Sequence, residues 1–274
     1  MIDVVKLVNE HKCIYDWADV ISSYNGYTLK IRVLKDAMKF NGIPAIDWKL
    51  KPINSSLTYN GVRLPATAHQ LQQIADKLSC MLLTPKVIDM IWLQADLQFD
   101  CITVVNSSIV ANANITSVHE AIESKIIKNG GDNNKKLISC VGKYWCLIND
   151  LGYKGYIAGD HVACNYGWFS STASGPGITP GTVCWQRPGF KHNKQHFDPS
   201  QTIRLMHRMA VLTKPNGEEE AADLHDIAGD EVLSNLIHHQ GKLTYLRQKG
   251  VPEETPLISK DLNPYLWKLT NKTI

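Results

Sequence analysis

Short apolar runs separated by glycine- and proline-rich breaks fill the second half of the chain, and this alternation limits the fold more than any other feature. The runs cover residues 137–148, 162–168, 183–186 and 202–212. Apolar runs of this length between turn residues are typical of strands, and the last run also alternates as a half-buried strand does. The sequence therefore predicts a mostly antiparallel sheet in this half, with a final strand over 242–248.

The middle of the chain has the periodicity of helices instead. Residues 67–79 place apolar side chains on one face, and Thr84-Pro85 combines a capping residue with a proline suited to the first helical turn. Residues 116–128 form a third expected helix, which ends at a glycine pair, and 218–239 a fourth. Together these segments predict an α+β protein with a helical middle region.

The first 65 residues mix both patterns. Residues 3–22 have helical periodicity, 27–40 look extended, and Asn41-Gly42 and Asn60-Gly61 are strong turn signals. We therefore expect an N-terminal helix and strand-rich region over 1–65 and a main α+β domain over 66–274. The alternative is one continuous domain.

Composition narrows the functional class only a little. The net charge of +3 comes without a compact basic block, so it gives no support for nucleic-acid binding. No apolar run reaches the roughly 18 residues of a membrane span, and residues 1–10 lack the apolar segment of a signal peptide. We expect a chain without a membrane span that is cytoplasmic as synthesised, and the oligomeric state stays open.

The seven cysteines are scattered and never spaced as C-x-x-C, which argues against a zinc ribbon or a disulfide scaffold. Most are expected to be buried, reduced thiols. A thiolate nucleophile at Cys164 or Cys184 is an alternative, although neither is surrounded by a known cysteine-peptidase signature. The seven are Cys13, Cys80, Cys101, Cys140, Cys146, Cys164 and Cys184.

Residues 186–201 hold the densest group of reactive side chains. His192, His196 and Asp198 can move protons, or can hold zinc through two imidazoles and a carboxylate. We expect His192 to be a general base or metal ligand, Asp198 to orient it or complete a metal site, and Ser200 to be a weaker nucleophile candidate. The alternative is a polar surface loop whose histidines happen to be close together.

Four further residues are expected to bind substrate. An aromatic pair at Tyr166 and Trp168 precedes the reactive run, and aromatic faces stack well on sugars and peptides. Gln186 and Arg204 flank the run on either side and add hydrogen-bonding groups.

Three elements of this sequence resemble an uncharacterised set of bacterial and phage-associated proteins. Those proteins carry an L-P-T-x-x-x-[VM]-[IV]-D-x-I-[YW] helix start, a Y-G-W-H element and an H-x-x-x-Y-x-D-Y-S-H-G-x-R-L element. The matches lie at 83–92, 166–169 and 192–206, in the same order. The resemblance implies a site around Asp198, Ser200 and Arg204 and an association with cell-wall-degrading modules.

The chain departs from that pattern at positions that bear on the chemistry. Phe169 replaces a histidine, and His196, Pro199 and Gln201 stand where tyrosine, tyrosine and histidine are expected. If the two lost histidines are catalytic in those proteins, this chain either uses His196 as a substitute or has lost activity.

Two functions of different class follow. The first is a hydrolase acting on a cell-wall-type polymer, either the peptide or the glycan of peptidoglycan, through a His/Asp site with zinc as a candidate cofactor. The second is a non-enzymatic binding or assembly module of a phage or bacterium. In that case Asp198 and Arg204 hold the loop and strand together, and Trp168 contacts a partner.

Overall fold

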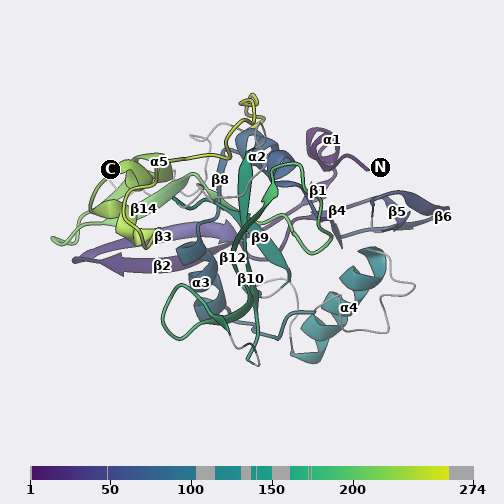
Figure 1. Ribbon diagram of the computed structural model, residues 1–274, viewed down its shortest axis with the longest axis horizontal. Coiled ribbons are helices and arrows are strands. Elements are labelled where there is room, and N and C mark those ends of the chain that lie inside the picture. Colours follow the sequence, from purple (N-terminus) through teal and green to yellow (C-terminus); the bar gives the residue numbers. More distant parts are fainter. Residues whose placement is uncertain are drawn as a thin grey trace, which may run out of the picture.

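The computed structural model describes residues 2–47, 49–102, 115–130, 137–139, 141–149, 161–171, 173 and 175–258. Within them, helices and antiparallel sheets are mixed, which confirms the α+β class (Figure 1). The helices are α1 (Val4–Asn9), α2 (Ala68–Lys77), α3 (Pro85–Gln94), α4 (Ile115–Lys128), α5 (Leu224–Gly229) and the 3-10 helix η2 (Leu233–Leu236). The strands are β1 (Cys13–Ile14), β2 (Trp17–Tyr24), β3 (Tyr27–Leu34), β4 (Lys39–Phe40), β5 (Ile43–Ile46), β6 (Pro52–Tyr59), β7 (Val62–Arg63), β8 (Cys80–Leu82), β9 (Lys143–Cys146), β10 (Val162–Phe169), β11 (Gly175–Pro176), β12 (Val183–Asn193), β13 (Leu205–His207), β14 (Met209–Thr213) and β15 (Glu219–Asp223).

The largest sheet has the order β15-β14-β3-β13-β8, with β2 paired to β3. It draws strands from both ends of the chain, so β3 from the N-terminal region lies beside β13 and β14 from the second half. The expected confinement of the sheet to the second half is therefore not confirmed. Strand partners are set by long-range packing, which local patterns do not contain.

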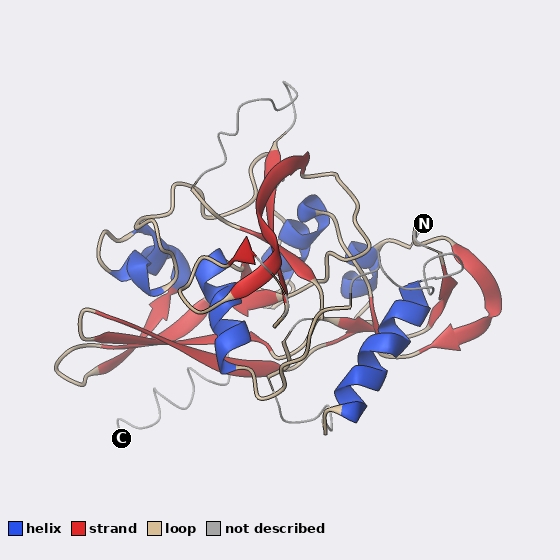
Figure 2. Ribbon diagram, turned by 60° about the horizontal axis from the view of Figure 1, so that its bottom comes forward, coloured by secondary structure: helices blue, strands red, loops and turns tan. Residues whose placement is uncertain are grey.

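A second sheet, β11-β12-β10-β9, stands across the middle of the molecule (Figure 1). Helix α3 packs on one side of β10 (Figure 2). Two smaller sheets, β1-β4-β7 and the β5-β6 hairpin, complete the described strands, and the hairpin extends to one end of the molecule near α4 (Figure 2). The second sheet carries the candidate site.

Two helices of the middle region begin where the sequence predicts. The Thr67 hydroxyl accepts the Gln70 N–H, and the Gln70 side chain accepts the Thr67 N–H, which completes a capping box. The Thr84 hydroxyl accepts the Val87 N–H, and Pro85 follows as the first helical residue. Because these caps are local, the sequence was sufficient to place both starts.

Three expected elements differ in the structure. Only residues 4–9 of the predicted 3–22 helix are helical, because 17–24 form β2 and pair with β3 along their whole length. The predicted helix over 218–239 begins as β15, which pairs with β14, and becomes helical only at α5. Residues 242–248 form no strand. In the first two cases a neighbouring strand outweighs helical periodicity.

One large apolar core joins the two main sheets, and α2 and α3 contribute to it. Six cysteines are described and carry free thiols, five of them buried, as expected, whereas Cys140 lies outside the described residues. No helix in the described part of the chain has both the length and the apolar character needed to cross a bilayer.

Candidate functional site

The second sheet has two chemically different faces. On the α3 side, Tyr144, Cys146, Cys164 and Tyr166 are buried in the core. Residues paired across an antiparallel sheet point to the same side, and neighbours along a strand point to opposite sides. The alternate positions therefore form the other face, on which polar side chains collect.

We call this second surface the polar face. The β9 residues Lys143 and Trp145 pair with Gly167 and Asn165 of β10, and β12 contributes residues paired with the same strand. Residues 200–202 run beside the free edge of β9, because the Lys143 N–H donates to the Ser200 carbonyl and the Thr202 N–H to the Lys143 carbonyl. The polar face thus consists of Lys143, Trp145, Asn165, Gln186, His192 and Gln201.

A tight turn brings His196 back over His192 at the end of β12. The Asn193 side chain accepts the Gln195 N–H, and the Asn193 carbonyl accepts the His196 N–H. The two imidazoles stack with their centroids 3.8 Å apart and their planes 10° apart. Both stand edge-on to the Trp145 ring, at 6.2 and 6.4 Å between centroids. The turn therefore replaces the helix that an i, i+4 pair of histidines would otherwise need.

Asp198 is held by a lysine rather than by a histidine. Its Oδ2 lies 2.6 Å from Lys143 Nζ, and its Oδ1 accepts the Ser200 hydroxyl at 2.5 Å and the Ser200 N–H at 2.9 Å. The Lys143 side chain is only 8% exposed and that of Asp198 20%. Ser200, the predicted nucleophile candidate, thus donates its hydroxyl proton toward Asp198 and supports the carboxylate.

The polar face shifts the pKa values of two of its groups. Burial, with help from the nearby His196 and Lys143, lowers the pKa of His192 below its ordinary value, and Asp198 opposes this effect. Burial alone would raise the pKa of Asp198, but hydrogen bonds from Lys143 and Ser200 outweigh it and lower the pKa. At neutral pH His192 is therefore a neutral base beside a charged ion pair.

This arrangement does not fit the predicted zinc site. The described residues contain no group of three or more His, Cys, Asp or Glu side chains placed to hold a metal. Zinc needs lone pairs that converge on one point, whereas two nearly parallel imidazoles direct theirs side by side. Both carboxylate oxygens of Asp198 already face Lys143 or Ser200. We therefore derive no metal-dependent step.

Trp168 lies at the edge of the polar face. Gly167 and Trp168 have φ angles of +122° and +58°, and a bulky residue rarely adopts the second value. The Lys143 ammonium lies 5.0 Å from the centroid of the Trp168 ring. Such strained backbone is found disproportionately at functional sites, and here it directs the indole toward the lysine that holds Asp198.

Two of the predicted substrate-binding residues have structural contacts instead. Tyr166 is on the core side of the sheet, where its hydroxyl donates to Asp89 Oδ1 at 2.5 Å and accepts the Ile178 N–H. Arg204 is 0% exposed, and its guanidinium donates to backbone carbonyls. Gln186 remains half-buried on the polar face, where its side chain donates to the Arg187 carbonyl.

Asp89 gives a pH-dependent prediction for stability. Burial raises its pKa, although Tyr166 and the Thr179 N–H donate hydrogen bonds to it. A carboxyl whose pKa is higher in the folded state stabilises the fold fully below its unfolded-state pKa. This stabilisation is lost as pH rises through the folded-state pKa. Asparagine does not titrate, and it loses an acceptor for Thr179. We expect Asp89→Asn to cost about 1–3 kcal/mol at low pH.

Urea unfolding measured at about pH 4, near the ordinary pKa of an aspartate, and at about pH 8 checks this linkage. The difference in the free energy of unfolding between wild type and Asp89→Asn should be smaller at the higher pH. A gap that widens instead would show that the ionised carboxylate is the form the fold prefers.

Two buried amides on the polar face were missed by the sequence patterns. Asn165 and Gln201 are 1% and 0% exposed, and neither side chain has a hydrogen-bond partner among the described residues. Buried amides nearly always have partners, so these two mark a place where water or a ligand belongs.

Lys143 was also missed, although it is the one charged residue in the apolar run 137–148. A charge inside such a run was the available signal.

Comparisons with known proteins add no assignment. No family model matches this chain, and no curated protein or solved structure matches it. The resemblance to bacterial and phage-associated proteins therefore stays a prediction, and the geometry of the polar face is the basis for function.

Proposed function

We propose that the chain is a hydrolase that cleaves a cell-wall-type polymer at the polar face, with His192 as the general base. The observation that carries the proposal is the convergence of His192, His196 and the ion pair of the buried Lys143 with Asp198 on one sheet face. A neutral imidazole near a buried ammonium is an arrangement suited to activating water beside a polarised carbonyl.

An amide bond suits this set of residues better than a glycosidic bond. Glycosidases ordinarily use two carboxyl groups, whereas the polar face and the loop over it bring one, Asp198, which is already ion-paired. In the proposed reaction His192 accepts a proton from water as the water oxygen bonds to the carbonyl carbon. The carbon–nitrogen bond then breaks, and the proton passes from His192 to the leaving amine. The peptide part of the polymer is thus the proposed substrate.

Lys143 has a positioning role in this scheme. Its ammonium uses one N–H on Asp198, and an ammonium has three donors in all. The ion pair is neutral overall, so the site does not select for a charged substrate. Asp198 fixes the ammonium in place.

The pH dependence of the rate tests the proposal. Because the pKa of His192 lies below its ordinary value, the neutral base persists to more acidic pH than for a free imidazole. We expect the rate of peptide release from purified peptidoglycan to stay level between about pH 8 and pH 6.5 and to fall below that range. A rate that falls already above the ordinary histidine pKa would contradict this assignment.

A binding or assembly module is the second candidate function. The β5-β6 hairpin exposes Ile53 and Leu57, at 60% and 54%, on a projecting end of the molecule (Figure 1). Exposed apolar side chains on such an element favour contact with a partner. If wild type binds peptidoglycan without releasing peptides at any pH, this second function replaces the first.

A further inference from the structure

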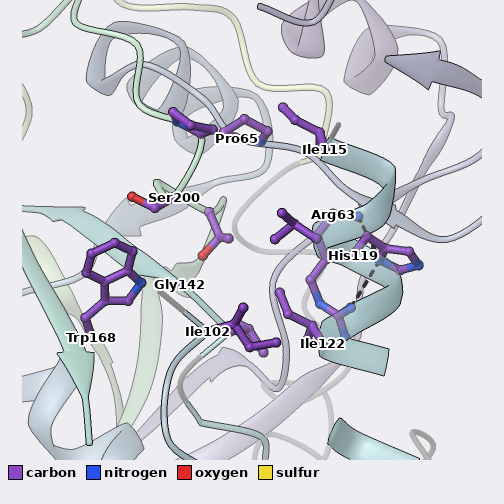
Figure 3. Close-up of a pocket in the computed structure, with 13 residues that line it drawn as sticks. Arg63, Pro65, Ile102, Ile115, His119, Ile122, Gly142, Trp168 and Ser200 are labelled. Atoms are coloured by element: carbon purple, nitrogen blue, oxygen red, sulfur yellow. Dashed lines mark hydrogen bonds between the residues drawn. The ribbon is translucent and has the colours of Figure 1, made fainter. Parts of the chain in front are cut away.

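A small cavity lies beside the polar face and shares two residues with the Asp198 loop. Trp168 and Ser200 lie on one side, and α4 forms the opposite side (Figure 3). Pro199 also lines the cavity. Its volume is about 30 Å³, which is room for one or two water-sized groups. Since Trp168 also lies beside Lys143, the cavity is connected to the candidate catalytic residues through that side chain.

The walls of the cavity are mainly apolar. Helix α4 contributes a row of side chains on one side, and Trp168 lies on the other (Figure 3). Water in such a place would need two to four polar partners, whereas Arg63 and Ser200 in the walls already have partners and the Thr202 hydroxyl is one group alone. An apolar group of the substrate is therefore the better occupant. The apolar residues are Pro65, Ile102, Ile115, Val118, Ile122, Val141 and Trp168.

The charged groups at one end of the cavity are already compensated. Arg63 donates to both oxygens of Asp36 and to Glu123 Oε1. His119 lies 3.2 Å from Arg63, and burial together with that arginine lowers the pKa of His119 to about 4. At neutral pH the imidazole is therefore uncharged, and the cavity has no unpaired charge to attract an ionic group.

Thr202 supplies the remaining polar atom. The residue is 7% exposed and lines the cavity, and its Oγ1 has no hydrogen-bond partner in the part of the chain that the structure describes. Ser200, the other hydroxyl in the wall, is engaged with Asp198. A buried hydroxyl without a partner marks a position where a ligand acceptor belongs.

We propose that this cavity binds a methyl group that stands next to a carbonyl, as in an alanine residue or an N-acetyl group of the substrate. The methyl packs among Ile115, Val118 and Ile122, and the carbonyl oxygen accepts the Thr202 hydroxyl proton. The inference rests on the proposed function and names the part of the polymer that the site selects. Its size and neutral walls exclude larger and charged side chains.

Methyl NMR of the whole chain, labelled at the isoleucine δ1 methyls, tests binding without requiring turnover. The probes are alanylalanine amide against glycylglycine amide, and N-acetylglucosamine against glucosamine, up to about 100 mM because so small a group binds weakly. In one of the two pairs, the compound that carries the methyl group should cause saturable chemical-shift changes of the Ile115 and Ile122 methyls, and its partner should not. The methyl of Ile127, which is 69% exposed on α4, should stay unchanged. The pair that responds identifies the peptide or the sugar as the source.

Two variants link the shifts to the cavity. Thr202→Val removes the hydroxyl and should weaken binding about 3- to 10-fold. Val118→Phe fills the space and should abolish the shifts, whereas Ile127→Phe, which adds the same ring to an exposed position of α4, should not. Equal shifts from both members of each pair, or none, would overturn the inference. Methyl-specific binding without peptide release would overturn the hydrolase proposal alone.

Discussion

Replacing Arg204 with alanine is expected to lower the free energy of unfolding by about 3–5 kcal/mol, the largest stability effect that the structure implies. The guanidinium donates to the carbonyls of Leu34, Lys35 and Ile138, each at 2.8 Å. It also lies 3.3 Å from the Tyr144 hydroxyl. Removing it leaves buried acceptors without a donor between the two main sheets, and such groups lose their hydration without compensation.

Urea denaturation with Arg187→Ala as the control measures this effect. Arg187 is exposed beside the polar face, so its loss should change stability by less than about 0.5 kcal/mol. A change below about 1 kcal/mol for Arg204→Ala would mean that the carbonyls find other partners. Arg204 would then again be a candidate for substrate binding, as the sequence predicts.

The parts of the fold that the sequence predicted depend on signals from neighbouring residues. The caps at Thr67 and Thr84 fixed the starts of α2 and α3 because a cap depends only on neighbouring residues. The Asn41-Gly42 and Asn60-Gly61 pairs are bends rather than chain reversals, because they lie opposite each other between the β4–β7 and β5–β6 pairings. The Asn60 side chain accepts the Gly42 N–H, and the Asn41 side chain accepts the Gly61 N–H. Unlike these bends, the two caps require no knowledge of distant segments.

The missed strand β2 shows where a local signal was present but misread. Asn25-Gly26 has φ angles of +48° and +79° and joins Tyr24 to Tyr27 in a two-residue hairpin. Such a pair is a strong hairpin signal, so the segment before it should have been expected to mirror the extended segment after it. The helical periodicity predicted over 3–22 instead placed residues 17–22 in a helix.

Only the part of the candidate site that is continuous in sequence was predictable. The reactive run around His192 was visible because its residues are close in sequence. Lys143 reaches Asp198 only because residues 200–202 pair with the edge of β9, and no local pattern contains that pairing. The burial of Tyr166 and Arg204 depends in the same way on α3 and β3, which lie elsewhere in the chain.

Replacing His192 with glutamine should reduce turnover by about 10²- to 10⁴-fold, because a positioned general base contributes about that much to a rate. Glutamine keeps polar bulk beside His196 and Trp145 but accepts no proton. The matched control is His239→Gln, since His239 is exposed and its ring faces Thr179 away from the polar face. The control should stay within about twofold of wild type, as a surface substitution does.

The most direct measurement is the release of peptides from purified peptidoglycan at about pH 7.5 by wild type and these two variants, each shown to be folded by its urea transition. The account predicts release by wild type and His239→Gln, and release reduced at least about 100-fold in His192→Gln. Equal release by folded His192→Gln and wild type, or no release by wild type, would contradict His192 as the base of a hydrolase.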